Sequence, residues 1–225
     1  MLKTILITGA SSGIGKELAK FFLNKDYQLI LSDKDKEGFR EFPNNNKVNM
    51  IIGDITKDDT LKQLKVAIEK VGRLDILINN AGITYIQPFE KNTDEQLDQI
   101  IEINLKSHIR ITRMIYPFMV KQQKGTIVFI NSSAGKEGKL HHTMYCATKF
   151  GLKGFADSLR LEAKKNNIRV ISIHPGGFKS NLYRNQPEVD QSAFMDPAQV
   201  AKVIFFLSET EGLSPDEIVI NRMKK

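Results

Sequence analysis

A serine, a tyrosine and a lysine in the second half of the chain have the types and spacing needed for proton transfer. Tyr145 follows Ser132 by thirteen residues and precedes Lys149 by four. On a helix, residues four apart share one face, so an ammonium would lie beside the phenol. At about 4 Å and an effective dielectric of about 20, it favours the phenolate by roughly 4 kcal/mol, or about three pKa units. We therefore expect Tyr145 to exchange protons near neutral pH, with the Ser132 hydroxyl holding the reacting oxygen, and an ordinary pair of surface neighbours is the alternative.

A second chemical feature is the glycine-rich segment near the start of the chain. It lies between an apolar run at 2–8 and a helical pattern at 16–24. A strand, a glycine turn and a helix together place backbone N–H groups and a positive helix end against a phosphate. A Cβ would hold a diphosphate off the backbone. The pattern predicts a dinucleotide site, with an empty tight turn as the alternative, at Gly9, Ser11, Ser12, Gly13, Ile14 and Gly15.

The residue at the end of the second expected strand bears on which dinucleotide binds. Asp33 can accept hydrogen bonds from both ribose hydroxyls of an adenosine. It also repels a 2′-phosphate by roughly 4 kcal/mol per charge pair at about 4 Å. Lys34 and Lys36 are near enough in sequence to offset part of that repulsion. We therefore predict NAD as the preferred cofactor and keep NADP, or a plain turn at Asp33, as alternatives.

Two further strand ends carry polar or small residues. Asp54 and Ile55 follow the third expected strand, where they could contact an adenine or simply start the next helix. The fourth strand ends in Asn79, followed by Asn80, Ala81 and Gly82. Amides and small residues suit a backbone that approaches a ligand closely, although they also suit an ordinary turn.

Strand and helix patterns alternate along the whole chain. We expect strands at 2–8, 27–32, 48–53, 74–79, 126–131, 168–173 and 217–220. We expect helices at 16–24, 57–71, 93–119, 143–165 and 197–207, the third of them closing near Pro117. Short apolar strands between longer helices imply right-handed crossovers and a parallel sheet covered on both faces. The predicted fold is α/β: a single-domain, doubly wound Rossmann fold over 1–225, with about seven strands.

Composition limits the alternatives. The chain has 225 residues with a formal net charge of +7, but its lysines are spread along its whole length rather than gathered in a basic stripe. We therefore expect no nucleic-acid partner. Cys146 is the single cysteine, so an internal disulfide is excluded. No stretch reaches the length of a membrane helix and the N-terminus does not resemble a signal peptide, so we expect no membrane partner and a cytoplasmic location.

Five separated motifs together resemble the short-chain dehydrogenase/reductase family, in its compact single-domain branch, over about residues 3–220. They are the glycine segment at 8–15, the Asn79 to Gly82 signature, Asn104 within 103–105, the Ser132, Tyr145 and Lys149 set, and the segment at 175–180. The last differs from the family pattern in having Ser180 where threonine is usual.

The resemblance implies hydride transfer between a nicotinamide cofactor and a small-molecule alcohol or carbonyl substrate. It assigns Tyr145 as the proton carrier, Ser132 as the group that steadies the substrate oxygen and Lys149 as the group that lowers the tyrosine pKa and holds the ribose. Asn104 corresponds to the asparagine that positions a relay water. The resemblance adds cofactor contacts at Pro175, Gly176, Phe178 and Ser180. A protein that binds the dinucleotide but has no catalytic activity is the alternative.

Several features depart from the family pattern. The expected substrate lid at 181–196 is short, and the basic ending at 221–225 replaces a glycine-rich tail. The resemblance implies a homodimer or homotetramer that forms through the two long helices, and these departures leave the choice between them open. His141 and His142 lie on the expected substrate side, where they could contact substrate or simply form a loop.

Overall fold

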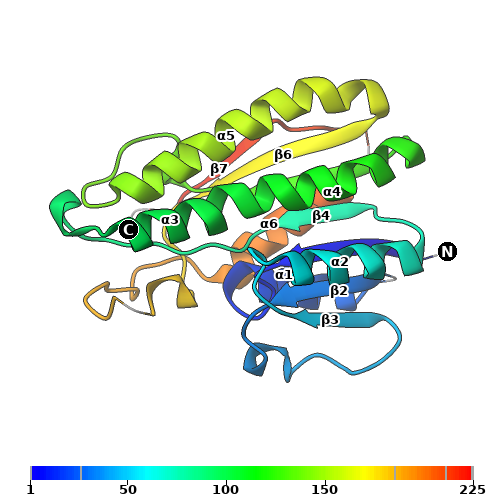
Figure 1. Cartoon of the computed structure of the whole chain (residues 1–225), viewed down its shortest axis with the longest axis horizontal. Helices are drawn as coiled ribbons and strands as arrows, with labels where there is room; N and C mark the ends of the chain where they lie inside the picture. The colour runs from blue at the N-terminus through cyan, green and yellow to red at the C-terminus, as the bar shows by residue number, and fades with distance from the viewer. Residues whose placement is uncertain (1, 26, 185, 211, 224–225) are drawn as a thin grey trace.

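The computed structural model describes residues 2–25, 27–184, 186–210 and 212–223. Within them, parallel strands form one sheet in the order β3-β2-β1-β4-β5-β6-β7 (Figure 1). The order reverses between β1 and β4, and this is where a doubly wound sheet opens a crevice at the carboxyl ends of its strands. The strands are β1 Lys3–Thr8, β2 Tyr27–Asp33, β3 Val48–Ile52, β4 Ile76–Asn79, β5 Gly125–Ile130, β6 Ile168–Pro175 and β7 Glu217–Ile220.

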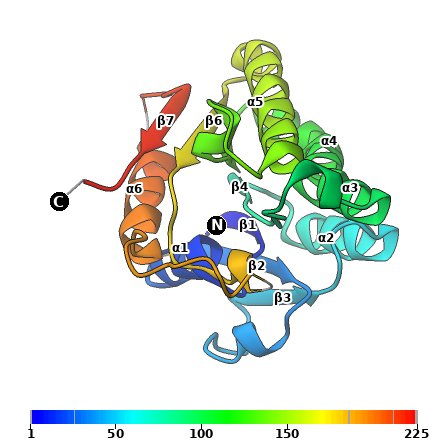
Figure 2. The same ribbon diagram turned by 90° about the vertical axis from the view of Figure 1, so that its left-hand side faces the viewer.

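Helices cover both faces of the sheet (Figure 2). On one face, α1 and α6 pack over a core that includes Ile7, Phe22 and Ile204. On the other, α2, α4 and α5 pack over a core that includes Leu64 and Phe129. Because both faces are covered, the strands are continuous apolar runs rather than alternating ones. The helices are α1 Gly13–Leu23, α2 Asp58–Val71, α3 Asp94–Ile101, α4 Ser107–Gln122, α5 Thr143–Ala163 and α6 Pro197–Glu209.

The predicted fold class is confirmed, and every predicted strand end lies within two residues of the observed one. The predicted helix at 93–119 is wrong in two details. A π-helical turn at Glu102–Lys106 separates α3 from α4, and α4 continues through Pro117 to Gln122. A proline usually ends or kinks a helix because it has no N–H to donate to the carbonyl oxygen of the preceding turn. Here a buried stripe spans the proline and holds both sides of the helix on the sheet, through Ile111, Ile115 and Met119.

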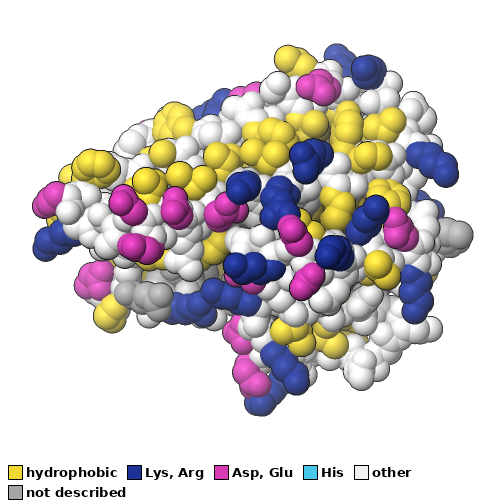
Figure 3. All heavy atoms as spheres, viewed as in Figure 1, with side chains coloured by type: hydrophobic (Ala, Val, Ile, Leu, Met, Phe, Trp, Pro, Cys, Tyr) yellow, Lys and Arg dark blue, Asp and Glu magenta, His cyan; other side chains and the backbone are white. Residues whose placement is uncertain are grey.

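The surface seen in Figure 3 has interspersed charges of both signs, together with hydrophobic side chains that gather over α4 and α5. Many of its charged groups are paired along one helix, as Lys65 is with Glu69 and Lys106 with Glu102. Among the described residues, no helix combines the length and apolar character needed to span a bilayer.

Candidate functional site

A cavity of about 240 Å³ opens at the carboxyl ends of β1, β2, β4 and β5. It brings together most of the residues predicted from the sequence, namely Gly9, Ser11, Ser12, Gly13, Ile14, Asp33, Asp54, Ile55, Asn80, Ala81, Gly82, Tyr145, Lys149, Phe178 and Ser180. The other predicted residues are outside the cavity wall, and these are Gly15, Asn104, Ser132, Pro175 and Gly176. The glycine turn lies at one end of this cavity, and Tyr145 and Lys149 line another part of it.

The glycine turn has the shape of a phosphate cradle. Gly9 and Gly13 have φ values of +65° and +53°, which side chains with a Cβ rarely adopt. A Cβ on Gly13 would lie 3.2 Å from Cβ of Ser180 on the opposite wall. Ser12 precedes α1 without capping it through its side chain, and the first turn of α1 carries no acidic residue. The first N–H groups of α1 can therefore bind an anion, so the turn fits a diphosphate.

The segment after β4 braces this turn. Nδ2 of Asn80 donates to the carbonyl oxygens of Thr8 and Gly9, at 3.0 and 2.9 Å. In return, Oγ1 of Thr8 accepts from the backbone N–H groups of Asn80 and Ala81, at 3.1 and 3.2 Å. Gly15 has a packing role, because a Cβ there would lie 2.2 Å from the carbonyl oxygen of Gly9. The Asn79 to Gly82 signature thus ties β4 to the turn that would hold the phosphates.

Acidic residues line the end of the cavity beside β2. Oδ2 of Asp33 accepts from the N–H of Ser11 at 3.2 Å, and Oδ1 accepts from the N–H of Asp35 at 3.1 Å. Lys34 and Asp35 also line the cavity. Asp54 forms a helix-start turn, because its Oδ1 accepts from both N and Oγ1 of Thr56. It lines the cavity as well, so the two interpretations of Asp54 are compatible.

The serine, tyrosine and lysine meet at the amino-terminal end of α5. Tyr145 and Lys149 are 8 % and 3 % exposed, and Nζ of Lys149 lies 5.6 Å from the centre of the tyrosine ring. Nζ also donates to the carbonyl oxygen of Ile130 at 3.1 Å. The Ser132 side chain acts on the Tyr145 hydroxyl and lowers its pKa, and Oγ of Ser132 accepts from the N–H of Ala134 at 3.1 Å. The hydroxyls of Ser132 and Tyr145 can therefore act on one substrate oxygen.

The expected lowering of the tyrosine pKa is wrong for the free protein. Burial raises the pKa of Tyr145 above its ordinary value, and the nearby Tyr183 adds to this, while the hydrogen bond from Ser132 acts in the opposite direction. Burial also lowers the pKa of Lys149, to about 8. Removing water disfavours the charged form of both groups, and this outweighs their attraction. Tyr145 is therefore a neutral phenol at pH 7 and can donate a proton.

Asn104 lies in the π-helical turn between α3 and α4 and is fully buried. Its Oδ1 accepts from the N–H of Ile83 at 2.9 Å, and its Nδ2 donates to the carbonyl oxygen of Ile83 at 2.9 Å. Nδ2 also lies 3.3 Å from Oγ1 of Thr148 on α5. The side chain of Asn104 thus anchors the segment after β4 to α5, and π-helical turns recur at functional sites.

The segment at 175–180 crosses from β6 toward the glycine turn. The N–H of Gly176 donates to the carbonyl oxygen of Ile220, so this part continues the sheet and does not line the cavity. The N–H of Ser180 donates to Oε1 of Gln191 at 3.0 Å. Phe178 and Ser180 reach the cavity over Gly13.

The two adjacent histidines occupy a loop beside the tyrosine. His141 has a φ of +61°, and Nδ1 of His142 lies 2.7 Å from the carbonyl oxygen of Leu140. The ring centres of His142 and Tyr145 are 6.2 Å apart. The loop conformation accounts for both residues, and neither lines the cavity.

Reasoning from the sequence missed several residues of the site. His108 is fully buried; its Nε2 lies 2.8 Å from the carbonyl oxygen of Ala81, and burial together with Lys149 lowers its pKa to about 3. It is neutral and holds the end of β4 in place. A histidine on an expected helix gave no signal of that contact. The other lining residues that sequence reasoning did not place at the cavity lie at or after strand ends, or on α3 and the turn that follows it: Lys34, Asp35, Gly53, Ile83, Thr84, Tyr85, Gln99, Ile103, Ile130 and Asn131. Asn181, Leu182 and Arg184 also line the cavity, and they fall within the expected lid at 181–196.

Comparison with known proteins agrees with this geometry. The family model described as short chain dehydrogenase matches residues 3–191. The chain is 33% identical over 225 residues to the 3-oxoacyl-[acyl-carrier-protein] reductase FabG of Thermotoga maritima, covering 93% of this chain and 92% of that one. It is 29% identical to carbonyl reductase family member 4 of Xenopus laevis, covering 98% and 97%. A short-chain dehydrogenase structure from Streptomyces avermitilis superposes with a TM-score of 0.87 at 26% identity, covering 98% and 88%. The chain therefore belongs to the short-chain dehydrogenase family of NAD(P)-dependent oxidoreductases.

Proposed function

We propose that this protein reduces the carbonyl group of a small molecule with NADH, and oxidises the corresponding alcohol in the reverse direction. The observation that carries the proposal is that Tyr145 and Lys149, both buried, line the same cavity as the glycine turn. The relatives named 3-oxoacyl-[acyl-carrier-protein] reductase, acetoacetyl-CoA reductase and carbonyl reductase support the carbonyl substrate class.

In this mechanism the side chains bind the substrate oxygen and supply its proton. The nicotinamide cofactor, when bound, supplies or accepts the hydride. Ser132 donates a hydrogen bond to the carbonyl oxygen and orients it. Tyr145 gives its phenolic proton to that oxygen as negative charge develops there. Lys149 stabilises the resulting phenolate, because its ammonium lies close to the tyrosine ring in a site with little water.

The proposed cofactor preference rests on the β2 end of the cavity. Asp33 is fixed there by the N–H groups of Ser11 and Asp35, and Asp35 adds a second carboxylate to the wall. Two carboxylates oppose a 2′-phosphate more strongly than one, and Lys34 offsets only part of the repulsion. The carboxylate of Asp33 remains free to accept from ribose hydroxyls, so NADH is the proposed partner.

The segment at 181–196 is proposed as the substrate lid. Asn181, Leu182 and Arg184 line the cavity from this segment, and the buried Gln186 donates through Nε2 to the carbonyl oxygen of Thr84 at 3.4 Å. This contact joins the lid to the segment after β4 across the cavity mouth. A short lid of this kind suits substrates whose distal part extends into solvent.

A homodimer is proposed through the face formed by α4 and α5. Phe150 and Leu161 are 46 % and 80 % exposed on α5, and hydrophobic side chains gather over this face in Figure 3. Burial of such a patch between two copies would remove it from water. Light scattering after size exclusion tests this: we expect a dimer for the wild type and a monomer for Leu161→Glu. A wild-type monomer would contradict the proposal.

The proposed activity is tested by a panel of carbonyl compounds that includes 3-oxoacyl thioesters and simple ketones. Oxidation of NADH and of NADPH is followed at about 340 nm, the absorbance band that both reduced cofactors share. We expect turnover with NADH that exceeds turnover with NADPH. Tight NADH binding with no turnover across the panel would instead favour a protein that only senses the dinucleotide.

A further inference from the structure

A set of buried polar atoms near Ser132 has no hydrogen-bond partner among the described residues. They are Nδ2 and Oδ1 of Asn131, Oγ of Ser172 and Nε2 of His174. Asn131 is 3 % exposed, and the other two residues are fully buried. A buried polar group without a partner costs about 1–3 kcal/mol, so several together call for an explanation.

The three side chains lie on one face of two neighbouring strands. β5 and β6 pair Phe129 with Ser172, and this parallel register continues to place Asn131 beside His174. Residues two apart in a strand point to the same face. Phe129 packs in the core beneath α4 and α5, so Asn131, Ser172 and His174 point the same way, toward α5. This polar cluster therefore lies beneath the helix that carries Tyr145 and Lys149.

One member of the cluster makes a direct contact with the catalytic segment. Nδ1 of His174 lies 3.0 Å from the carbonyl oxygen of Ser132. A carbonyl oxygen only accepts, so Nδ1 carries the proton and donates it to this bond. Burial lowers the pKa of His174, so the ring is neutral and its Nε2 is an acceptor. Nε2 therefore requires a donor, and both Asn131 and Ser172 can provide one.

The segment that follows Ser132 is also held from β7. Glu217 pairs with Lys136, which lies four residues after Ser132, and with Lys153 of α5 at 2.8 Å. These three charged groups are the ones that act on His174. The segment is thus held at two points, by an imidazole on the Ser132 carbonyl and by a carboxylate on Lys136.

We propose that His174 is a positioning residue for Ser132. Its Nδ1–H fixes the Ser132 carbonyl and thereby the direction of the Ser132 hydroxyl toward Tyr145. Asn131 and Ser172 keep the proton on Nδ1 by donating to Nε2 through a buried water. The proposal rests on the proposed function, because it assumes that Ser132 orients the substrate oxygen.

Two substitutions separate positioning from packing. In His174→Asn, Nδ2 of the amide takes the place of Nδ1 and still donates, whereas His174→Leu fills a similar volume without a donor. We expect His174→Leu to lower kcat about tenfold with the NADH dissociation constant unchanged within about twofold. We expect His174→Asn to keep most of kcat. The proposal is overturned if His174→Leu keeps kcat within twofold, or if His174→Asn loses as much as His174→Leu at equal thermal stability.

A second measurement does not depend on turnover. Nitrogen-15 NMR of the histidine rings in the wild-type protein reports which ring nitrogen of His174 carries the proton, with His174→Asn assigning the signal. We expect a neutral ring protonated at Nδ1 at pH 7, and a ring protonated at Nε2 or at both nitrogens would contradict the proposal. Absence of any wild-type turnover would refute the proposed function, while this spectrum would still decide how His174 binds Ser132.

Discussion

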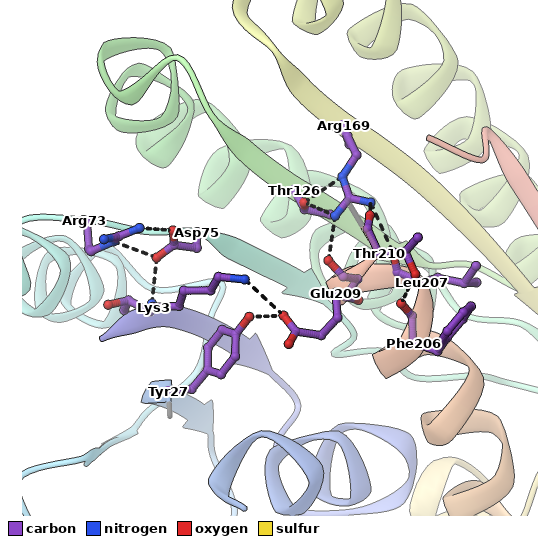
Figure 4. A network of polar contacts seen from close by, with 12 residues as sticks. Lys3, Tyr27, Arg73, Asp75, Thr126, Arg169, Phe206, Leu207, Glu209 and Thr210 are labelled. Carbon is purple, nitrogen blue, oxygen red and sulfur yellow. Dashed lines mark hydrogen bonds and ion pairs between the residues drawn. The ribbon is translucent and has the colours of Figure 1, made fainter. Parts of the chain in front are cut away.

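Polar groups at the two ends of the sheet differ in whether they have partners within the chain. At the amino ends of the strands, Asp75 accepts from the N–H of Thr4 and from Nε of Arg73, both at 2.8 Å (Figure 4). Oε1 of Glu209 accepts a hydrogen bond from the Tyr27 hydroxyl and lies 3.6 Å from Nζ of Lys3. Arg169 donates to carbonyl oxygens at the end of α6, including that of Leu207 at 3.2 Å. A hollow of about 200 Å³ lies here, and its charged lining residues are engaged within the chain.

At the carboxyl ends, several polar groups are buried with few or no partners. Lys149 is 3 % exposed, and among the described residues its Nζ donates to the carbonyl oxygen of Ile130. Oγ1 of Thr84, like the amide of Asn131, is buried without a partner among the described residues. Such groups reduce stability, and they are retained where a ligand or a reaction uses them.

Charged groups are therefore paired within the chain at one end of the sheet, whereas at the other end the proposed function gives the buried Lys149 a role in the reaction. Removal of a charged group should therefore have opposite consequences for folding at the two ends. Each of the following substitutions tests that difference between the two ends of the sheet.

The largest effect is expected for Lys149→Met. The substitution removes the ammonium that stabilises the phenolate of Tyr145, and we expect kcat to fall about 10³-fold. It also removes a buried charge, so we expect the free energy of unfolding at pH 7 to rise by about 1–3 kcal/mol. Steady-state kinetics and denaturant unfolding measure the two effects. A lower stability together with the lost activity would place Lys149 among ordinary structural lysines.

The pH dependence of stability should also show the cost of burying the Lys149 ammonium. The pKa of Lys149 is about 8 in the folded state and about 10.4 in an unfolded chain. Between these values the unfolded state binds more protons, so stability rises with pH, by up to about 3 kcal/mol in total. Below pH 8 both states are protonated and the full cost of burial remains. We expect the difference in unfolding free energy between the wild type and Lys149→Met to show this rise between about pH 8 and 9.5. This range lies below the one in which tyrosines titrate. If that difference does not change with pH, the claim that burial lowers the pKa of Lys149 is contradicted.

At the amino end, Asp75→Ala should do the reverse of Lys149→Met. It leaves the buried N–H of Thr4 and the guanidinium of Arg73 without their acceptor, at a cost of about 2–3 kcal/mol. We expect lower stability, with kcat per folded molecule unchanged within about twofold. Asp59→Ala on the exposed start of α2 is the matched control and should change neither quantity. A clear loss of kcat in Asp75→Ala would show that the two ends are coupled.

The smallest effect is expected at the cofactor preference. Asp33→Ser removes one carboxylate that faces the adenosine ribose, and we expect the NADH to NADPH affinity ratio to fall about tenfold. Fluorescence titration of both cofactors into the wild type and the variant measures the ratio. If the wild type already binds NADPH more tightly, the preference proposed from Asp33 is wrong.

Much of the cavity was predictable because the carboxyl ends of parallel strands lie along one edge of the sheet. Residues that follow an apolar strand, such as Gly9, Asp33 and Asn80, therefore had to gather there. The four-residue interval between Tyr145 and Lys149 placed both on one helix face, and they line one cavity. Local pattern and chain order were sufficient for these features.

The remainder depends on burial and on contacts between distant segments. The raised pKa of Tyr145 follows from loss of water, which no spacing reveals. Asn131 and His174 become neighbours only through the register of β5 and β6. The continuation of α4 through Pro117 depends on packing against the sheet, which outweighs the local preference of proline.

The central claim is that Tyr145 donates the proton within a site that binds the cofactor independently of that proton. The most direct measurement compares Tyr145→Phe with the wild type, pairing kcat for carbonyl reduction with the NADH dissociation constant from calorimetry. We expect kcat to fall about 10³-fold or more, with the dissociation constant within about threefold because the glycine turn and Asp33 are untouched. Retention of kcat within tenfold, with cofactor binding intact, would contradict the account.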